Sequence, residues 1–328
     1  MKRSTFLRHA LAWPLLGAAG LTQAQAQSPA LPGSIKVLVG FPPGGAPDVI
    51  ARAFAEQLRA QTGATVVVEN RAGAAGKLAV DALLQAPADG ATVTVMPASA
   101  LILVPMLVKS ARYDVARDFV TLGSVAQYGF GFGAGPMAQS VDFEQFKAWV
   151  KAHPDKASYA TPGVGTPQHF LGAQLGQLAG ASMNHIPYKG GANALSDVLG
   201  GQVALLVTTE QLLVPHHQQG KLRTLMVTSR ERNPKMPDVP TVRELGHPHL
   251  EAHDWFGVFA RAGTPANRVD PWRDAIARVA AAPGYTQAIT QQGYSLSRGG
   301  WQELPQQLER ERAAWAERVR VSGFTAAD

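Results

Sequence analysis

Short apolar runs along the chain alternate with amphipathic stretches, and this alternation predicts the class of fold. The helix predicted at residues 48–61 carries its apolar stripe on Val49, Ile50, Phe54 and Leu58. Strands alternating with helices of this length are typical of βαβ units, in which helices cover both faces of a mostly parallel sheet. Predicted strands in this first part lie at residues 35–39, 65–68 and 92–96, and a second helix ends at Leu84.

The same alternation begins again near Ser158 and predicts a second α/β lobe. Two apolar, glycine-containing segments, at residues 122–136 and 255–265, separate the two sets and are expected to cross between the lobes. We therefore predict a two-lobed α/β fold, with residues 31–128 plus 255–328 in one lobe and residues 129–254 in the other. Predicted strands of the second set are 158–161, 183–186, 203–208 and 222–227, its helices are 168–178, 192–199 and 210–218, and the tail adds a helix at 304–319.

Composition and the N-terminal segment limit the classes of protein to which the chain can belong. Of 328 residues, 46 % are apolar and 16 % are charged, which excludes a disordered chain, and the absence of cysteine excludes disulfides and thiolate chemistry. Residues 1–26 combine a basic start, an apolar stretch and the small-residue site Ala24-Gln25-Ala26, which predicts a secretory signal peptide and an exported, periplasmic protein. Three of the 30 basic residues lie in this leader, which leaves 27 against 24 acidic residues. No basic stripe interleaved with aromatics occurs, so we expect no nucleic-acid partner.

Two similar glycine-rich loops, one in each predicted lobe, carry the candidate chemistry. Each loop, at residues 43–47 (Pro-Gly-Gly-Ala-Pro) and residues 162–167 (Pro-Gly-Val-Gly-Thr-Pro), follows a strand and opens a helix. Glycine permits tight turns and close approach of a ligand, and proline suits the first helical turn. Free N–H groups at such a helix start bind anions. A charged hydrogen bond contributes about 1.5–3 kcal/mol, so two loops together suffice for micromolar binding of a small carboxylate. The alternative is that both are ordinary strand-to-helix turns.

Motifs for other chemistries are absent from the chain. It contains no GxxxxGK[ST] and no GxGxxG, because the glycines from Gly129 to Gly135 alternate without completing that pattern. Neither GxSxG nor HExxH occurs, so a hydrolase lacks its usual local signature.

A set of ordered motifs from Ile35 to the C-terminus resembles one family. They include Gly40-Phe41-Pro42-Pro43-Gly44-Gly45, Val68-Glu69-Asn70-Arg71, Pro187-Tyr188-Lys189-Gly190, Asp238-Val239-Pro240-Thr241 and Trp255-Phe256-Gly257. The chain is similar to the substrate-binding receptors of tripartite tricarboxylate transporters, the Bug proteins, which have the type II periplasmic-binding-protein fold. The resemblance implies two lobes that close on a small organic carboxylate, which the receptor delivers to a membrane permease.

The resemblance also implies which residues lie at the binding site. The carboxylate is expected at the loops formed by residues 44–46 and 163–166, partly through ordered water, with other side chains near the cleft. The ligand-binding residues expected on this basis are Phe41, Pro43, Gly44, Gly45, Ala46, Asp48, Asn70, Ser99, Gly163, Val164, Gly165, Thr166, His169, Tyr188 and Thr208. No catalytic residue, cofactor or metal is implied, and we expect a monomer.

The chain departs from the family pattern at positions that bear on the ligand. Many relatives carry an acidic residue in or at the end of the strand after Gly-Gly-Gln-Val, whereas residues 203–209 here are Val-Ala-Leu-Leu-Val-Thr-Thr. This difference favours plain mono- or dicarboxylates, or aromatic carboxylates, over amino acids. Ala72 also replaces the usual proline after Asn-Arg.

Several side chains have more than one interpretation. Asp48 either caps its helix or accepts a hydrogen bond from the ligand, and His169 either faces the cleft or bonds within its helix start. The exported enzyme that remains as an alternative would use His169, Tyr188 and Lys189 as acid–base groups, and a ligand-presenting sensory module is a third. In a regular strand, residues 247, 249, 251 and 253 (His, His, Glu, His) would share one side as metal ligands, but Pro248 interrupts that regularity.

Overall fold

The computed structural model describes residues 31–296, 300–322 and 324. The predicted signal peptide, residues 1–26, lies outside the described residues. The strands are β1 (Ser34–Val39), β2 (Thr65–Asn70), β3 (Thr92–Pro97), β4 (Phe119–Ala134), β5 (Ser158–Thr161), β6 (Asn184–Pro187), β7 (Leu205–Thr209), β8 (Arg223–Val227) and β9 (His253–Arg261). The α-helices are α1 (Ala46–Thr62), α2 (Lys77–Gln85), α3 (Ala98–Leu107), α4 (Val115–Asp118), α5 (Phe143–Ala152), α6 (Pro167–Ala179), α7 (Gly191–Leu199), α8 (Glu210–Gln218), α9 (Ala266–Ala281), α10 (Pro283–Gln291) and α11 (Leu304–Ser322). Short 3₁₀ helices are η1 (Ala74–Gly76) and η2 (Pro248–Leu250).

The strands form one sheet with two parallel halves and an antiparallel middle. The order is β2-β1-β3-β9-β4-β7-β5-β6, and β8 also pairs with β4. β1 is parallel to β2 and β3, and β5 is parallel to β6 and β7. β9 is antiparallel to both β3 and β4. The predicted α/β class with a mostly parallel sheet in each half is therefore confirmed.

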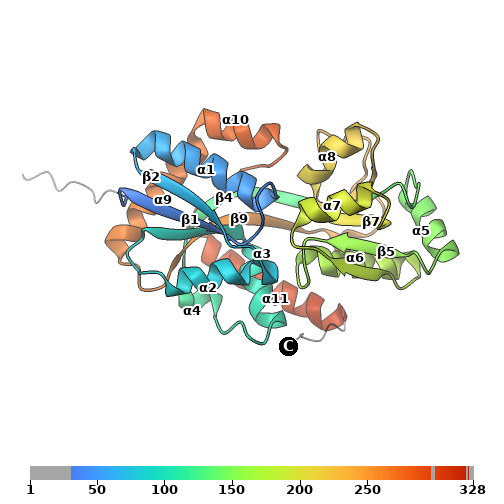
Figure 1. Cartoon of the computed structure of the whole chain (residues 1–328), viewed down its shortest axis with the longest axis horizontal. Helices are drawn as coiled ribbons and strands as arrows, with labels where there is room; N and C mark the ends of the chain where they lie inside the picture. The colour runs from blue at the N-terminus through green and yellow to red at the C-terminus, as the bar shows by residue number, and fades with distance from the viewer. Residues whose placement is uncertain (1–30, 297–299, 323, 325–328) are drawn as a thin grey trace, which may run out of the picture.

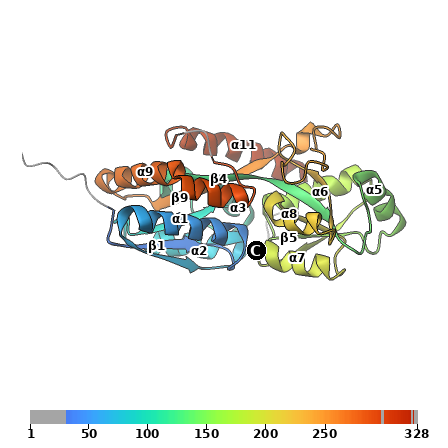
Figure 2. The same ribbon diagram turned by 90° about the horizontal axis from the view of Figure 1, so that it is seen from above.

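The 16-residue strand β4 connects the two halves (Figures 1 and 2). Its first part, up to Gly129, pairs with β9, and the part from Phe130 to Ala134 pairs with β7 and β8. Because the two ends of β4 pair with different strands, this one continuous strand joins two groups of elements. β4 and β9 thus correspond to the two predicted crossover segments at residues 122–136 and 255–265.

Alternating side chains of β1 build the core on both faces of the first half of the sheet. Ile35, Val37 and Val39 pack in the cluster that includes α1, α9 and α10, whereas Leu38 faces the cluster of α2, α3 and α11. Figure 1 shows α1 and α10 on one side of the sheet and α2 and α11 on the other. This is the period-2 pattern expected for a strand covered by helices on both faces.

Helix α3, in which Ser99 is the one polar residue, was missed by the sequence analysis. All but two of its ten residues are buried, and apolar residues occupy every side of it. A periodicity argument needs a polar face, so it gives no signal for a helix of this kind. The helix matters because it begins with Ala98 and Ser99 at the carboxyl end of β3.

The last helix, α11, packs on α3 and also reaches the second half of the molecule. Leu304, Leu308 and Trp315 share a core cluster with α3. The Trp315 ring also lies 6.5 Å from that of Phe170 in α6. The tail therefore contacts both groups of elements.

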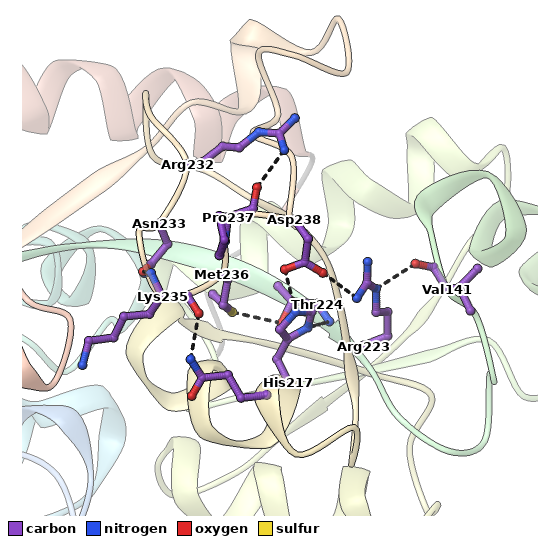
Figure 3. Close-up of polar contacts among 11 residues, drawn as sticks. Val141, His217, Arg223, Thr224, Arg232, Asn233, Lys235, Met236, Pro237 and Asp238 are labelled. Carbon is purple, nitrogen blue, oxygen red and sulfur yellow. Dashed lines mark hydrogen bonds and ion pairs between the residues drawn. The ribbon is translucent and has the colours of Figure 1, made fainter.

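The segment that follows β8 folds back onto β8 and α8 and is held there by polar contacts (Figure 3). Asp238 accepts a hydrogen bond from Arg223 at 2.8 Å and lies 3.2 Å from the His217 ring nitrogen. Arg223 also donates to the Val141 carbonyl at 3.0 Å. These contacts position Asn233, which donates to the buried Glu210 at 2.9 Å at the start of α8.

Candidate functional site

The first glycine-rich loop is shaped by the side chain of Asp48. Gly44 has a φ of +81°, a left-handed conformation that glycine adopts without strain. Its N–H donates to Asp48 Oδ2 at 3.0 Å, across the first turn of α1. Asn70, at the end of β2, donates to both the Phe41 carbonyl (3.0 Å) and Asp48 Oδ1 (2.9 Å). Asp48 and Asn70 therefore hold the loop from behind.

Electrostatics keep Asp48 ionised in this role. Burial alone would raise the pKa of its carboxyl, but hydrogen bonds from Arg52, Gly44 and Asn70 outweigh it and lower the pKa. Arg52 Nε lies 2.9 Å from Oδ2. Asp48 thus bonds Gly44, the residue before the N-cap of α1, while the N-cap Gly45 itself makes no side-chain hydrogen bond.

The second glycine-rich loop is held by its own hydroxyl and by His169. Gly165 has a φ of +74°, and its N–H points to His169 Nδ1 at 3.3 Å. The Thr166 hydroxyl donates to the Gly163 carbonyl at 2.9 Å. Thr161, at the end of β5, donates to the same carbonyl at 3.1 Å. The loop conformation is thus fixed by contacts that lie within α6, β5 and the loop itself.

His169 belongs to a half-buried ring stack behind the loop. Its ring lies 3.9 Å from that of His185, which stacks in turn on Tyr159 at 4.9 Å. Burial lowers the pKa of both imidazoles, and the neighbouring His169 helps to lower that of His185 to about 3. Both rings are therefore neutral near pH 7. His169 serves the helix start, which is the second of its two predicted roles.

The two loops meet across a cavity, as the internal repeat in the sequence predicts. The space in which the centre of a water molecule fits is about 70 Å³. The cavity therefore holds roughly five waters, which suits a short organic ion. Lysine 189 is the charged side chain among the lining residues. The lining consists of Phe41, Pro42, Pro43, Gly45, Ala46, Pro47, Ala75, Pro97, Ser99, Ala100, Tyr128, Pro162, Gly165, Thr166, Pro167, Gln168, Lys189, Gly190, Gly191, Ala192, Asn193, Thr208, Thr209, Leu212 and Phe256.

Three helix N-termini converge on this cavity. α1, α6 and α7 all begin among the lining residues, and none receives a side-chain hydrogen bond from its own N-cap residue. The first N–H groups of a helix have no acceptor inside that helix, and the helix dipole places partial positive charge there. Together the three ends form a positive region suited to a carboxylate.

One buried side chain adds an unsatisfied polar atom to this region. Gln168, in the first turn of α6, is 6 % exposed, and within the described part of the chain its Oε1 has no hydrogen-bond partner. This oxygen is itself enclosed, with less than 1 Å² of accessible surface, so it does not face the cavity.

The structure brings together some of the predicted site residues and separates others. Asp48, Asn70 and His169 act behind the loops, and the Gly44 N–H is taken by Asp48. The Tyr188 hydroxyl donates to Asp197 at 2.6 Å. Lining the cavity are Phe41, Pro43, Gly45, Ala46, Ser99, Gly165, Thr166 and Thr208, whereas Gly163, Val164 and Tyr188 line a neighbouring groove.

Sequence reasoning missed the contributions of α7 and of the crossover strands. Gly191 and Asn193 begin α7 at the cavity, and Tyr128 and Phe256 reach it from β4 and β9. The sequence Lys189-Gly190-Gly191 after a strand was the available signal for α7, since Gly190 has a φ of +113°. Nothing in the local sequence indicated Tyr128.

The structure does not gather the side chains of the histidine-rich segment at residues 247–253 into one cluster. The described residues hold no group of three or more histidine, cysteine or acidic side chains placed to bind a metal ion. Glu251 instead accepts a hydrogen bond from Arg243 at 3.0 Å, and the His247 ring packs edge-on to Phe143. Among all residues that the structure describes, no helix has the length and apolar content needed to cross a membrane.

Comparison with known proteins decides the family. The sequence model of the protein family described as tripartite tricarboxylate transporter family receptor matches residues 50–321 of this chain. The chain belongs to this family. Its members are transporter receptors, which bind their ligands and are not enzymes. The receptor is 38 % identical to protein BugT of Bordetella pertussis over 232 residues, which cover 70 % of this chain and 71 % of that protein.

Solved structures agree with this assignment and with the type II periplasmic-binding-protein fold. The periplasmic binding protein BugD aligns with a TM-score of 0.84 at 30 % identity, covering 90 % of the receptor and 99 % of that chain. A Rhodopseudomonas palustris protein solved with adipate has a TM-score of 0.84 at 26 % identity, covering 90 % and 98 %. MatC from the same species, solved with bound malate, has a TM-score of 0.81 at 27 % identity, covering 87 % and 98 %.

Proposed function

We propose that this receptor is a monomeric, exported solute-binding protein that captures a small organic carboxylate in the cavity and delivers it to a membrane permease. The observation that carries the proposal is the convergence of three uncapped helix N-termini on one cavity. Relatives whose structures contain adipate or malate support the carboxylate class. The signal peptide predicted at residues 1–26 supports export to the periplasm.

The proposed lobes are residues 31–128 plus 255–328 and residues 129–254, which close on the ligand. In support, β4 exchanges β9 for β7 and β8 as pairing partners between Gly129 and Phe130. Contacts between the lobes are close beside the cavity, because a Cβ on Gly165 would lie 2.7 Å from Leu107 Cδ1 in α3.

A thermal unfolding screen tests the ligand class. Mono-, di- and aromatic carboxylates are compared with neutral sugars and divalent cations at matched ionic strength. A carboxylate at 100 times its dissociation constant is expected to stabilise the receptor by about 2.7 kcal/mol, because it binds only the folded state. The proposal fails if no carboxylate raises the midpoint while a sugar or cation does.

Gly165→Ala is expected to weaken carboxylate binding about tenfold. The new methyl group would lie 2.7 Å from Leu107 Cδ1, which must shift before the lobes come together. Gly44→Ala is the matched control, because Gly44 also has a positive φ but has no atom within 4 Å of an added Cβ. Isothermal titration measures both affinities. Equal loss in the two variants would show that backbone strain, not the contact between lobes, explains the effect.

A further inference from the structure

A fourth helix end at the cavity differs from the other three, because a carboxylate from a distant strand accepts a hydrogen bond from an N–H group of its first turn. α3 begins at the cavity, where Ser99 and Ala100 are lining residues. The Ser99 N–H donates to Oδ1 of Asp254 at 3.3 Å. Asp254 belongs to β9, 155 residues away in sequence, and is 2 % exposed. The partial positive charge of the α3 N-terminus is therefore already neutralised within the protein.

Hydrogen bonds to Asp254 also determine which way two hydroxyl groups face. Oδ1 accepts from the Trp255 N–H at 2.8 Å as well as from Ser99. Oδ2 accepts from the Tyr128 hydroxyl at 2.8 Å and from the Ser99 hydroxyl. Asp254 is the acceptor in all four contacts, so both hydroxyl protons point at Oδ2. Burial raises the pKa of Asp254 above its ordinary value, and these hydrogen bonds oppose that rise. A hydroxyl whose proton is engaged has only lone pairs left for another partner.

At this end of the cavity, the Ser99 and Tyr128 hydroxyls offer lone pairs that can accept hydrogen bonds. Neither hydroxyl has a free proton to donate. Ser99 and Tyr128 both line the cavity, and Phe256, which stacks on Tyr128 at 4.6 Å, supplies apolar surface beside them. Glu311 of α11 lies behind the same wall, where it accepts a hydrogen bond from the Trp255 indole at 3.1 Å. We call this part, made of Ser99 and Tyr128 backed by Asp254, the acceptor end.

We infer that the acceptor end selects a ligand that carries a hydrogen-bond donor in addition to its carboxylate. The inference rests on the proposed function, which places the carboxylate at the N-termini of α1, α6 and α7. A hydroxyl or an ammonium group on the ligand satisfies the lone pairs of Ser99 and Tyr128, whereas a plain methylene leaves them unpaired. Sites built to bond a ligand hydroxyl or amine reject analogues that lack it for this reason.

The inference differs from the expectation drawn from the sequence. The apolar run at residues 203–209 favoured plain carboxylates because it lacks an acidic residue. The fold supplies a carboxylate from another strand, β9, and conveys its effect through Ser99 and Tyr128. Hydroxy acids and amino acids share the required donor, and titration distinguishes them.

Two matched ligand series test the inference by isothermal titration of the purified receptor. One series is succinate, malate and aspartate, and the other is propionate, lactate and alanine. At least one donor-bearing member is expected to bind tenfold or more tightly than the plain acid of its series. A preference for malate or lactate identifies a hydroxyl as the donor, and a preference for aspartate or alanine identifies an ammonium group.

Variants then attribute this preference to the acceptor end. Asp254→Asn and, with less disturbance of the core, Ser99→Ala are expected to reduce the preference to threefold or less. Asp197→Asn is the matched control, since Asp197 also accepts from a tyrosine hydroxyl but does not line the cavity, and it should keep the preference.

The possible failures are distinguishable. Plain acids that bind within threefold of their donor-bearing analogues would overturn the inference and leave the proposed function standing. An unchanged preference in Ser99→Ala would also overturn it. If no acid of either series binds, and other carboxylates do not bind either, the proposed function fails together with the inference.

Discussion

Gly40→Ala is expected to lower the free energy of unfolding by about 3 kcal/mol. Gly40 directly follows β1 and packs against the backbone of Gly76, so an added Cβ would lie 2.5 Å from the Gly76 Cα and 3.0 Å from its carbonyl oxygen. Backbone atoms cannot move aside as a side-chain end can. The substitution therefore forces apart η1 and the backbone that directly follows β1. Urea denaturation followed by circular dichroism measures the change.

Gly33→Ala is the matched control for this prediction. Gly33 lies just before β1, has no atom within 4 Å of an added Cβ, and, like Gly40, does not have a positive φ. Alanine at this position is expected to leave stability within about 0.5 kcal/mol of wild type. Similar midpoints for the two variants would contradict the close backbone contact at Gly40.

Glu311→Gln is expected to stabilise the receptor by about 3 kcal/mol at pH 8 and to have little effect at pH 4. Burial, with a contribution from the neighbouring charge of Asp254, raises the pKa of Glu311 to about 7 from its ordinary 4.5. Between these two values the folded state binds more protons than the unfolded state. Stability from this group is therefore greatest at low pH and falls as pH rises from 4.5 through 7.

The difference between variant and wild type isolates this group from the others that titrate. Urea denaturation at pH 4, 5, 6, 7 and 8 gives the free energy of unfolding of each protein. The single side-chain oxygen of glutamine can still accept from both Trp255 and Gln307, because both donors reach Oε1 of Glu311, at 3.2 Å and 2.8 Å. Glu309→Gln, on the exposed side of the same helix, is the control and should give a pH-independent difference of at most about 0.5 kcal/mol. A flat difference for Glu311→Gln would contradict a raised pKa.

Prediction from sequence succeeded where the signal is local. Strand, glycine-rich loop and helix follow one another within about 25 residues in both halves, and the structure places α1 and α6 as expected from Ile50, Phe54 and the prolines at the helix starts. Helix α8 begins and ends at the predicted residues. These features depend on backbone conformation and on side chains within a few turns, which the order of residues specifies directly.

Prediction was incomplete where a residue acts through a distant partner. Asp48 and His169 stand beside the glycine-rich loops in sequence, yet both turn toward the loop backbone and away from the cavity. Their neighbours Asn70 and His185, which hold them there, come from other strands. Local spacing identifies such residues as part of the site but does not show whether they support it or line it.

The sequence by itself determined an α/β chain with two glycine-rich helix starts, one in each half, because hydrophobic periodicity and glycine and proline chemistry are properties of short segments. Only the tertiary structure decided that α7 adds a third helix end, that Gln168 is buried at the start of α6, and that Asp254 reaches Ser99 across 155 residues. The physical reason is that the charge and hydrogen-bonding character of a cavity are summed over strands from both halves of the fold. That sum exists only when the sheet has brought them together.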